Sequence, residues 1–244
     1  MFTTIKKIIP NTITSFNLLS GCMALVFVFQ DKFEIAAWLI LFAVFFDFCD
    51  GLAARALKAY SALGVQLDSL ADMVSFGLVP AAMLHRLLIK INPDLLSNSI
   101  WGILLYGFPF IITVFSALRL AKFNIDNRQH DSFLGLTTTA NAILIVSSVI
   151  AAEKYQIFNY IFSSDILIML ICIIVSALLV CEIPMFSLKI KFGESKIIKK
   201  NIVQIIFLLA AIALVIVFGC AGVSLSTILY ILYSIIKAIT SKNK

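Results

Sequence analysis

Acidic side chains gather in a strongly apolar part of this chain. The sequence has 13 Asp and Glu among its 244 residues, and four of them fall close together, at Asp47, Asp50, Asp68 and Asp72. A carboxylate at the depth of a lipid bilayer costs about 3 kcal/mol on insertion scales. Four carboxylates also repel one another, so the cluster calls for a cation.

The spacing of the four aspartates suits a shared ion. Asp47 and Asp50 are three residues apart and Asp68 and Asp72 are four apart, so each pair lies on one face of a helix. Two such helices facing each other would form an all-oxygen site. Oxygen ligands without His or Cys favour Mg²⁺, Mn²⁺ or Ca²⁺ over zinc or copper, and magnesium commonly bridges carboxylates to phosphates. A proton or cation relay in a transporter is the alternative that the aspartates alone leave open.

The elements that must position these aspartates are membrane helices. Hydrophobic residues make up 61% of the chain and charged residues 13%, with a mean hydropathy of +1.06, whereas soluble domains are about a quarter charged. We therefore expect an all-α integral membrane protein, a polytopic bundle of about eight transmembrane helices. The apolar segments predict helices near 14–30, 33–57, 66–90, 99–122, 135–152, 157–180, 202–219 and 222–238.

The basic residues predict an orientation. The chain has 19 Lys and Arg residues. If the N-terminus lies in the cytoplasm, the four on the opposite side of the membrane are Lys32, Arg86, Lys90 and Lys154. This asymmetry favours an even number of spans with both termini cytoplasmic. A six-span bundle with two interfacial segments is the alternative. The net charge of +6 is interpreted as this orientation signal, and no nucleic-acid partner is expected.

A longer motif surrounds the aspartates. Residues Asp47–Asp72 read D-x2-D-G-x2-A-R-x8-G-x3-D-x3-D, with Gly51, Arg55 and Gly64 at the fixed positions between the acids. This pattern resembles the signature of the CDP-alcohol phosphotransferase family at every defining position. A glycine permits close approach of a ligand, and an arginine offers planar donors to a diphosphate. A transporter leaves these residues unexplained.

The resemblance implies a site with two divalent cations, Mg²⁺ or Mn²⁺. In the family the first and third aspartates bridge both ions, here Asp47 and Asp68, while Asp50 completes one ion and Asp72 the other. The fourth aspartate is also the family's general base, so Asp72 would accept the proton of the acceptor alcohol. The resemblance further implies that Gly51, Arg55 and Ser61 bind the CDP-linked substrate and that CMP leaves.

Other stretches resemble the serine-accepting branch of the family, the phosphatidylserine synthases. This resemblance implies CDP-diacylglycerol and L-serine as substrates. The stretches are Pro10–Asn17, Asp72–Gly77, Arg119–Asn124, Phe133–Thr137 and Pro184–Lys189. Two departures from the branch are Lys122, where it has arginine, and Thr137, where it has proline.

Serine carries a carboxylate that needs a cation. Arg119 is the candidate and Lys122 the second choice, while Asn17 and Ser75 are further candidates for substrate binding. A sister transferase that accepts glycerol 3-phosphate or inositol phosphate is the alternative, and it would require an extra basic pocket.

The resemblance covers roughly residues 1–190, which we expect to form a catalytic membrane domain with a six-helix core. Residues 191–244 would add a basic cytoplasmic loop and two C-terminal transmembrane helices to the same bundle. We expect a multi-pass protein of the cell (inner) membrane, surrounded by membrane lipids, with its site open to the cytoplasm. The resemblance also implies a homodimer.

Overall fold

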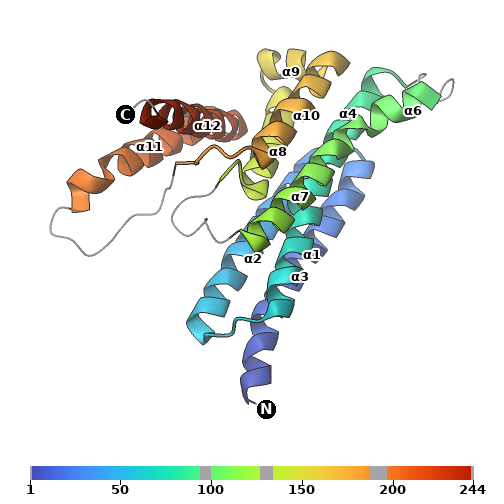
Figure 1. Ribbon diagram of the computed structural model, residues 1–244. Coiled ribbons are helices and arrows are strands. Elements are labelled where there is room, and N and C mark those ends of the chain that lie inside the picture. Colours follow the sequence, from blue (N-terminus) through green and yellow to red (C-terminus); the bar gives the residue numbers. More distant parts are fainter. Residues whose placement is uncertain (1, 94–99, 127–133, 187–196, 243–244) are drawn as a thin grey trace.

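Helices account for nearly all of the described chain (Figure 1). The computed structural model describes residues 2–93, 100–126, 134–186 and 197–242, and within these residues there is no β-strand. The elements in chain order are α1 (Phe2–Phe29), α2 (Phe33–Leu57), α3 (Ala62–Asp72), the π-helix η1 (Met73–Leu78), α4 (Val79–Ile91), α6 (Ile100–Gly107), the 3₁₀-helix η2 (Phe108–Phe110), α7 (Ile111–Ile125), α8 (Thr138–Ala152), α9 (Gln156–Phe162), α10 (Asp165–Val180), α11 (Ile197–Phe218) and α12 (Cys220–Lys242).

The lengths of these helices indicate a multi-pass membrane protein. Within the described residues five helices are long and apolar enough to cross a bilayer, and the number rises to six if a bent pair counts as one span. The expected all-helical membrane fold is therefore confirmed, but the count of eight spans is not. The five spans are Lys6–Phe29, Phe33–Leu57, Ala62–Ile91, Gly102–Ile125 and Cys220–Thr240.

Two expected helices differ from the structure. The first helix begins at Phe2 rather than near residue 14. The single helix expected over 157–180 is instead α9 and α10, which meet at an angle of 88°. Polar residues mark this break, because the hydroxyl of Ser163 donates to Asn159 Oδ1 and the carboxylate of Asp165 accepts the N–H of Ile166. Such side chains compete with helix hydrogen bonds and favour helix ends.

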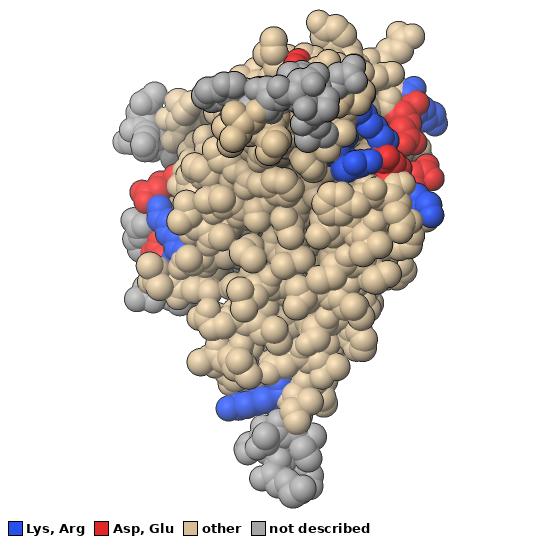
Figure 2. All heavy atoms as spheres, turned by 90° about the vertical axis from the view of Figure 1, so that its right-hand side faces the viewer, with Lys and Arg blue, Asp and Glu red and all other residues tan. Residues whose placement is uncertain are grey.

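The surface supports the membrane assignment. Large apolar side chains on the outside of the bundle are well exposed, among them Trp38, Phe48 and Leu63, as expected where lipid replaces water. Figure 2 shows charged side chains toward the upper half of one face and a basic side chain at its lower end, with an uncharged surface between them. This band is the part of the face that a bilayer would cover.

The N-terminal helix α1 contacts several other helices of the bundle. It packs against α2, α3, η1 and α4. Gly21 makes this approach possible, because a Cβ there would lie 2.9 Å from the Cα of Ser75 and collide with its side chain. The π-helical turn η1 follows Asp72 directly, and the N–H of Val79 bonds to the carbonyl of Val74, five residues back.

The two C-terminal helices pack on the rest of the bundle through α12. Figure 1 shows α11 and α12 lying together at one side, and α12 contacts both α11 and α8. The hydroxyls of Ser147 and Ser224 lie 2.8 Å apart across the contact between α8 and α12. The expected domain boundary at residues 190/191 lies outside the described residues.

Candidate active site

A short turn brings the two aspartate pairs together. Helix α2 ends at Leu57, and the next residue, Lys58, adopts the left-handed conformation (φ 51°). Ser61 directly precedes α3, and its hydroxyl accepts the N–H of Gly64 at 3.0 Å. A serine in this position satisfies a backbone donor that the first helical turn leaves free. The chain thus reverses over the four residues 58–61, and α3 returns past the end of α2.

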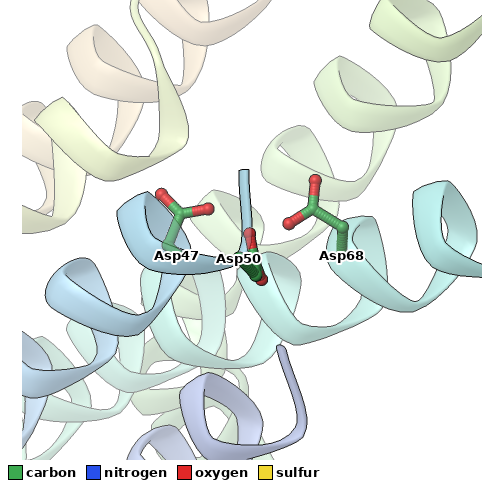
Figure 3. Close-up of side chains that lie close together, drawn as sticks. All are labelled: Asp47, Asp50 and Asp68. Atoms are coloured by element: carbon green, nitrogen blue, oxygen red, sulfur yellow. The ribbon is translucent and has the colours of Figure 1, made fainter. Parts of the chain in front are cut away.

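Three of the four aspartates converge. Asp47 and Asp50 from α2 and Asp68 from α3 each offer a carboxylate oxygen, and these oxygens lie within 4.8 Å of one another. In Figure 3 Asp50 lies between Asp47 and Asp68. The Oδ1 atom of Asp68 is buried and has no hydrogen-bond partner among the described residues. Carboxylates held so close together repel one another unless a cation lies between them.

Thr14 of α1 holds the middle carboxylate. Its hydroxyl donates to Asp50 Oδ2 at 2.6 Å, and the side chain of Thr14 is 3% exposed. A hydrogen bond from a neutral hydroxyl orients the carboxylate without neutralising its charge. Thr14 therefore fixes the orientation of the Asp50 carboxylate.

Asp72 occupies a separate position one turn beyond Asp68. It is not one of the three converging carboxylates; its Oδ1 accepts a hydrogen bond from Asn17 Nδ2 at 3.2 Å. Asn17 is fully buried and its Oδ1 has no partner within the described part of the chain. Ser75 donates to the backbone carbonyl of Asn17 at 3.1 Å. The contacts of Ser75 thus position Asn17, and those of Asn17 orient Asp72.

A cavity of about 170 Å³ adjoins the carboxylates. Arg55 and Gly51 face it from α2, and a Cβ on Gly51 would lie 3.6 Å from the guanidinium of Arg55. Gly64 lies on the opposite wall, where a Cβ would come within 3.0 Å of Asn11 Oδ1 and Ser61 Oγ. The cavity is lined by Pro10, Asn11, Thr14, Asp50, Gly51, Ala54, Arg55, Ala59, Tyr60, Ser61, Gly64, Val65 and Asp68.

The two predicted basic residues of α7 have different surroundings. Arg119 is only 7% exposed, its Nε has no hydrogen-bond partner among the described residues, and it is within range of a charge interaction with Asp72. Lys122 is well exposed and forms an ion pair with Glu182, at 2.8 Å between Nζ and Oε1. Arg119 is therefore a buried cation whose Nε is available to a ligand, whereas the charge of Lys122 is compensated by Glu182.

Sequence reasoning named Asn17 of α1 as a candidate but missed two other residues of this helix. Asn11 and Thr14 line the cavity, but neither was among the predicted site residues. A signal was present, because Asn11, Thr14, Asn17 and Gly21 recur every three or four residues in an otherwise apolar segment. This spacing places small and polar side chains on one helix face. Tyr60 also lines the cavity, and no comparable pattern marks it.

Comparison with known proteins agrees with this geometry. A CDP-diacylglycerol–serine O-phosphatidyltransferase of Helicobacter pylori (strain ATCC 700392 / 26695) is 28% identical, over 96% of this chain and 95% of that protein. Proteins of the same name from Bacillus subtilis (strain 168) and Methanocaldococcus jannaschii are each 33% identical, over 52% and 63% of this chain and 67% of each relative. Residues 7–176 match the family model described as CDP-alcohol phosphatidyltransferase, and the chain therefore belongs to this family.

Proposed function

We propose that this enzyme transfers the phosphatidyl group of CDP-diacylglycerol to the hydroxyl of L-serine, giving phosphatidylserine and CMP. The observation that carries the proposal is the convergence of Asp47, Asp50 and Asp68 beside a cavity lined by Arg55. The family supports the phosphoryl-transfer chemistry, and relatives named for the serine reaction support the acceptor.

The residues present fit divalent cations. Three carboxylates within 4.8 Å form a hard oxygen site, and the buried Oδ1 of Asp68, which no described residue contacts by a hydrogen bond, has a lone pair available to a metal. Asp47, Asp50 and Asp68 would hold one ion, and Asp72 would complete a second with Asp47 and Asp68. Bound Mg²⁺ or Mn²⁺ would neutralise the diphosphate and stabilise the charge on the departing CMP.

The cavity suits the nucleotide half of the donor. Arg55 offers several N–H donors to a diphosphate, and Gly51 leaves open space beside that guanidinium. Ser61 lines the same cavity but its hydroxyl already accepts the N–H of Gly64. The role of Ser61 is therefore to fix the start of α3 while its remaining donor faces the ligand.

Asp72 acts as the general base in this proposal. Its carboxylate accepts the proton of the serine hydroxyl as the oxygen bonds to the phosphorus that carries diacylglycerol. The bond from that phosphorus to the oxygen of CMP breaks, and CMP leaves with the electron pair. Asn17 donates a hydrogen bond to one oxygen of this carboxylate and would orient it toward the acceptor.

The charge balance beside Asp72 favours serine over a phosphorylated acceptor. Arg119 provides one positive charge for one carboxylate. Among the described residues near it, Lys122 is bound to Glu182 and adds no free charge. Glycerol 3-phosphate or inositol phosphate would bring a phosphate with a larger charge, which one arginine balances poorly.

The positions of basic residues also support a location in the cell and an orientation in the membrane. Arg55 and Lys58 stand at the end of α2 that carries the site, as expected for a cytoplasmic end. We therefore infer a site that faces the cytoplasm, in a multi-pass protein of the inner membrane with both termini inside. Lipid donor would enter laterally while serine and CMP exchange with water. Residues 1–190 would form the catalytic domain, 191–244 would extend it, and the protein would act as a homodimer.

Purified enzyme in detergent or lipid tests this proposal. CDP-diacylglycerol and labelled serine are supplied with and without Mg²⁺ or Mn²⁺, and CMP and lipid product are measured for the wild type and for Asp72→Asn. We expect metal-dependent labelling of lipid that the variant loses. CMP release that requires another alcohol would retain the family reaction and overturn serine as acceptor. A folded protein that releases no CMP with any alcohol would contradict the enzyme assignment.

A further inference from the structure

A second cavity lies at the end of the bundle opposite to the aspartate cluster. Its volume of about 570 Å³ is within the range of about 300–1,000 Å³ that is common for ligand sites in proteins. Its walls come from the turn between α1 and α2, the start of α2, the ends of α4 and α8, and the short helix α9 with the turn that follows it. No residue lines both this cavity and the one beside the aspartates, so the two are separate.

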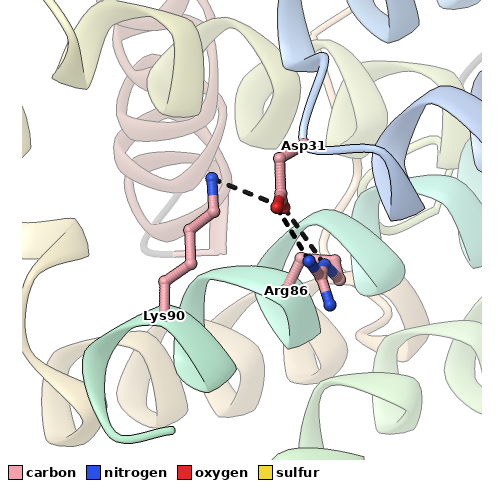
Figure 4. A network of polar contacts seen from close by, with 3 residues as sticks. All are labelled: Asp31, Arg86 and Lys90. Carbon is pink, nitrogen blue, oxygen red and sulfur yellow. Dashed lines mark hydrogen bonds and ion pairs between the residues drawn. The ribbon is translucent and has the colours of Figure 1, made fainter.

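Opposite charges face this cavity without a full counterpart. Arg86 binds both oxygens of Asp31, at 2.8 and 3.1 Å, whereas Lys90 lies 3.4 Å from the same carboxylate (Figure 4). Because one carboxylate cannot balance two cations, part of the charge of Lys90 remains available. Glu153 lines the same cavity, and its carboxylate has neither a hydrogen bond nor an ion pair to a described residue. The cavity therefore offers one positive and one negative group to a ligand.

Helix α9 indicates that the cavity lies at the level of the membrane surface. It meets α10 at 88°, and Figure 1 shows it at the end of the bundle away from the turn between α2 and α3. Phe158 and Phe162 of α9 are buried in the core, whereas Ile157 and Tyr160 are exposed. A short helix that crosses the end of the bundle with apolar and aromatic side chains outside is suited to the boundary between headgroups and acyl chains.

The walls combine the groups that a zwitterionic lipid requires. A phosphate diester accepts hydrogen bonds from the ammonium of Lys90, and a primary ammonium donates hydrogen bonds to the carboxylate of Glu153. Leu87, Ile91 and Val149 line the same cavity and provide an apolar surface for the first carbons of an acyl chain. A small soluble zwitterion would leave this apolar surface in water, so a lipid fits the cavity better.

We propose that this cavity binds one phospholipid of the leaflet farther from the aspartates, whose headgroup joins a phosphate diester to a primary amine, as in phosphatidylethanolamine. Lys90 binds the phosphate and Glu153 binds the ammonium. The bound lipid holds α4, α8 and α9 together at this end of the bundle. Because the two cavities share no residue, the lipid takes no part in the reaction proposed above.

A titration of the purified enzyme in detergent tests the site. Bound lipid is counted by native mass spectrometry with phosphatidylethanolamine, with phosphatidylcholine, whose ammonium has no N–H, and with phosphatidylglycerol, which has no amine. We expect one phosphatidylethanolamine to bind about tenfold more tightly than either other lipid, as for one hydrogen bond between charged groups. Equal binding of the three lipids by the wild type would overturn the proposal.

Two variants assign the contacts and a third serves as the control. Glu153→Gln should lose most of the preference for phosphatidylethanolamine, and Lys90→Gln should weaken the binding of all three lipids. Lys154→Gln should bind lipid as the wild type does, because Lys154 lies over the ring of Tyr155 and does not line the cavity. A preference that survives in Glu153→Gln would overturn the assignment of the cavity.

Thermal unfolding separates a specific site from a general effect of lipid. Phosphatidylethanolamine should raise the unfolding temperature of the wild type and of Lys154→Gln more than that of Glu153→Gln. Unfolding temperatures without lipid show whether each variant is folded. Soluble phosphoethanolamine at the same concentration should displace none of the bound lipid, and complete displacement would overturn the choice of a lipid as ligand. The rate of CMP release should be the same in all these variants, and a rate lowered by Glu153→Gln would contradict the separation of the two cavities.

Discussion

The two ends of the long helical span Ala62–Ile91 carry charged side chains in opposite arrangements. At the end near the site, the carboxylate of Asp68 converges with those of Asp47 and Asp50 from α2. At the other end, Arg86 donates to Asp31 through Nη2 at 2.8 Å and through Nε at 3.1 Å, and Lys90 lies 3.4 Å from the same carboxylate (Figure 4). In the cluster around Asp31 the carboxylate is paired with two cations, whereas the aspartate cluster leaves negative charge that a ligand must balance.

The difference separates stability from function. The pair of Arg86 with Asp31 ties the turn between α1 and α2 to α4 and needs nothing from outside. The aspartate cluster costs the folded protein free energy, because like charges are held together away from water. Functional sites commonly carry such a cost, and substitutions that remove it tend to stabilise the protein while abolishing its activity.

The largest expected effect comes from breaking the aspartate cluster. In Asp47→Asn we expect CMP release to fall on the order of a thousandfold, about 4 kcal/mol of transition-state stabilisation. In the presence of EDTA the same variant should unfold at a higher temperature than the wild type, because one repelling charge is gone. Thermal unfolding and CMP assays on the same preparation check both parts. A variant that loses stability in EDTA would contradict the repulsion.

Metal binding should stabilise the folded protein through the aspartate cluster and not through the cluster around Asp31. A divalent cation at a hundred times its Kd stabilises the folded state by about 2.7 kcal/mol if it binds no unfolded chain. We expect Mg²⁺ or Mn²⁺ to raise the unfolding temperature of the wild type and to leave that of Asp47→Asn nearly unchanged. Asp31→Asn serves as the control and should respond to metal as the wild type does. A similar response in Asp47→Asn would place the ion elsewhere.

A smaller effect on activity is expected when Thr14, which bonds to Asp50, is changed. Thr14→Val keeps the shape of the side chain but removes the 2.6 Å hydrogen bond to Asp50. Because hydrogen bonds to charged groups contribute about 1.5–3 kcal/mol, activity should fall roughly tenfold or more, and a higher metal concentration should be needed for half-maximal CMP release. Thr12→Val is the control, since the exposed Thr12 hydroxyl bonds to the carbonyl of Ile8. Equal effects in both variants would remove the role of Thr14.

The smallest effect is expected at the opposite end. The hydrogen bond from Arg86, and the charges of Lys90 and Arg86, hold the pKa of Asp31 below its ordinary value of 3.8. Asp31→Asn should lower the free energy of unfolding by about 0.2–1 kcal/mol, since the pair is partly exposed to solvent. Activity should be unchanged.

The contribution of Asp31 to stability should depend on pH. A lowered pKa in the folded state stabilises the protein above the pKa of the unfolded chain, and the stabilisation is lost as the pH falls through the folded value. The difference in unfolding temperature between wild type and Asp31→Asn should therefore be full above about pH 5 and disappear in more acidic solution. A difference that persists there would point to packing instead of charge.

The aspartates were predictable from the sequence, whereas the residues that support them were either missed, as Thr14 was, or named for substrate binding, as Asn17 and Ser75 were. A carboxylate in a membrane helix costs free energy, and the four acids are spaced to share helix faces. Residue type and spacing alone therefore identify Asp47, Asp50, Asp68 and Asp72. Thr14 and Asn17 are ordinary residues for a membrane helix, and their roles depend on how closely α1 approaches α2 and α3. Gly21 permits that approach, but small residues are common wherever membrane helices pack, so a glycine alone does not mark the contact.

The positions of the helices were predicted better than their bends. Apolar runs set the positions of the spans because a helix in lipid must satisfy its backbone internally. The bend of 88° between α9 and α10 arises at Ser163 and Ser164, which the hydropathy of the segment masks.

The π-helical turn Met73–Leu78 determines how the side chains at one end of the span Ala62–Ile91 are rotated around the helix axis relative to those at the other end. In a π-helical turn each hydrogen bond encloses one more residue than in an α-helix, and one residue corresponds to about 100° of rotation around an α-helix. The face that carries Asp68 and Asp72 is therefore turned relative to the face that carries Arg86 and Lys90. Removal of one residue from this turn would restore α-helical geometry and keep every charged residue of both clusters. It would also rotate Asp68 and Asp72 relative to Arg86 and Lys90, so that one of these pairs would no longer point toward the residues it now contacts.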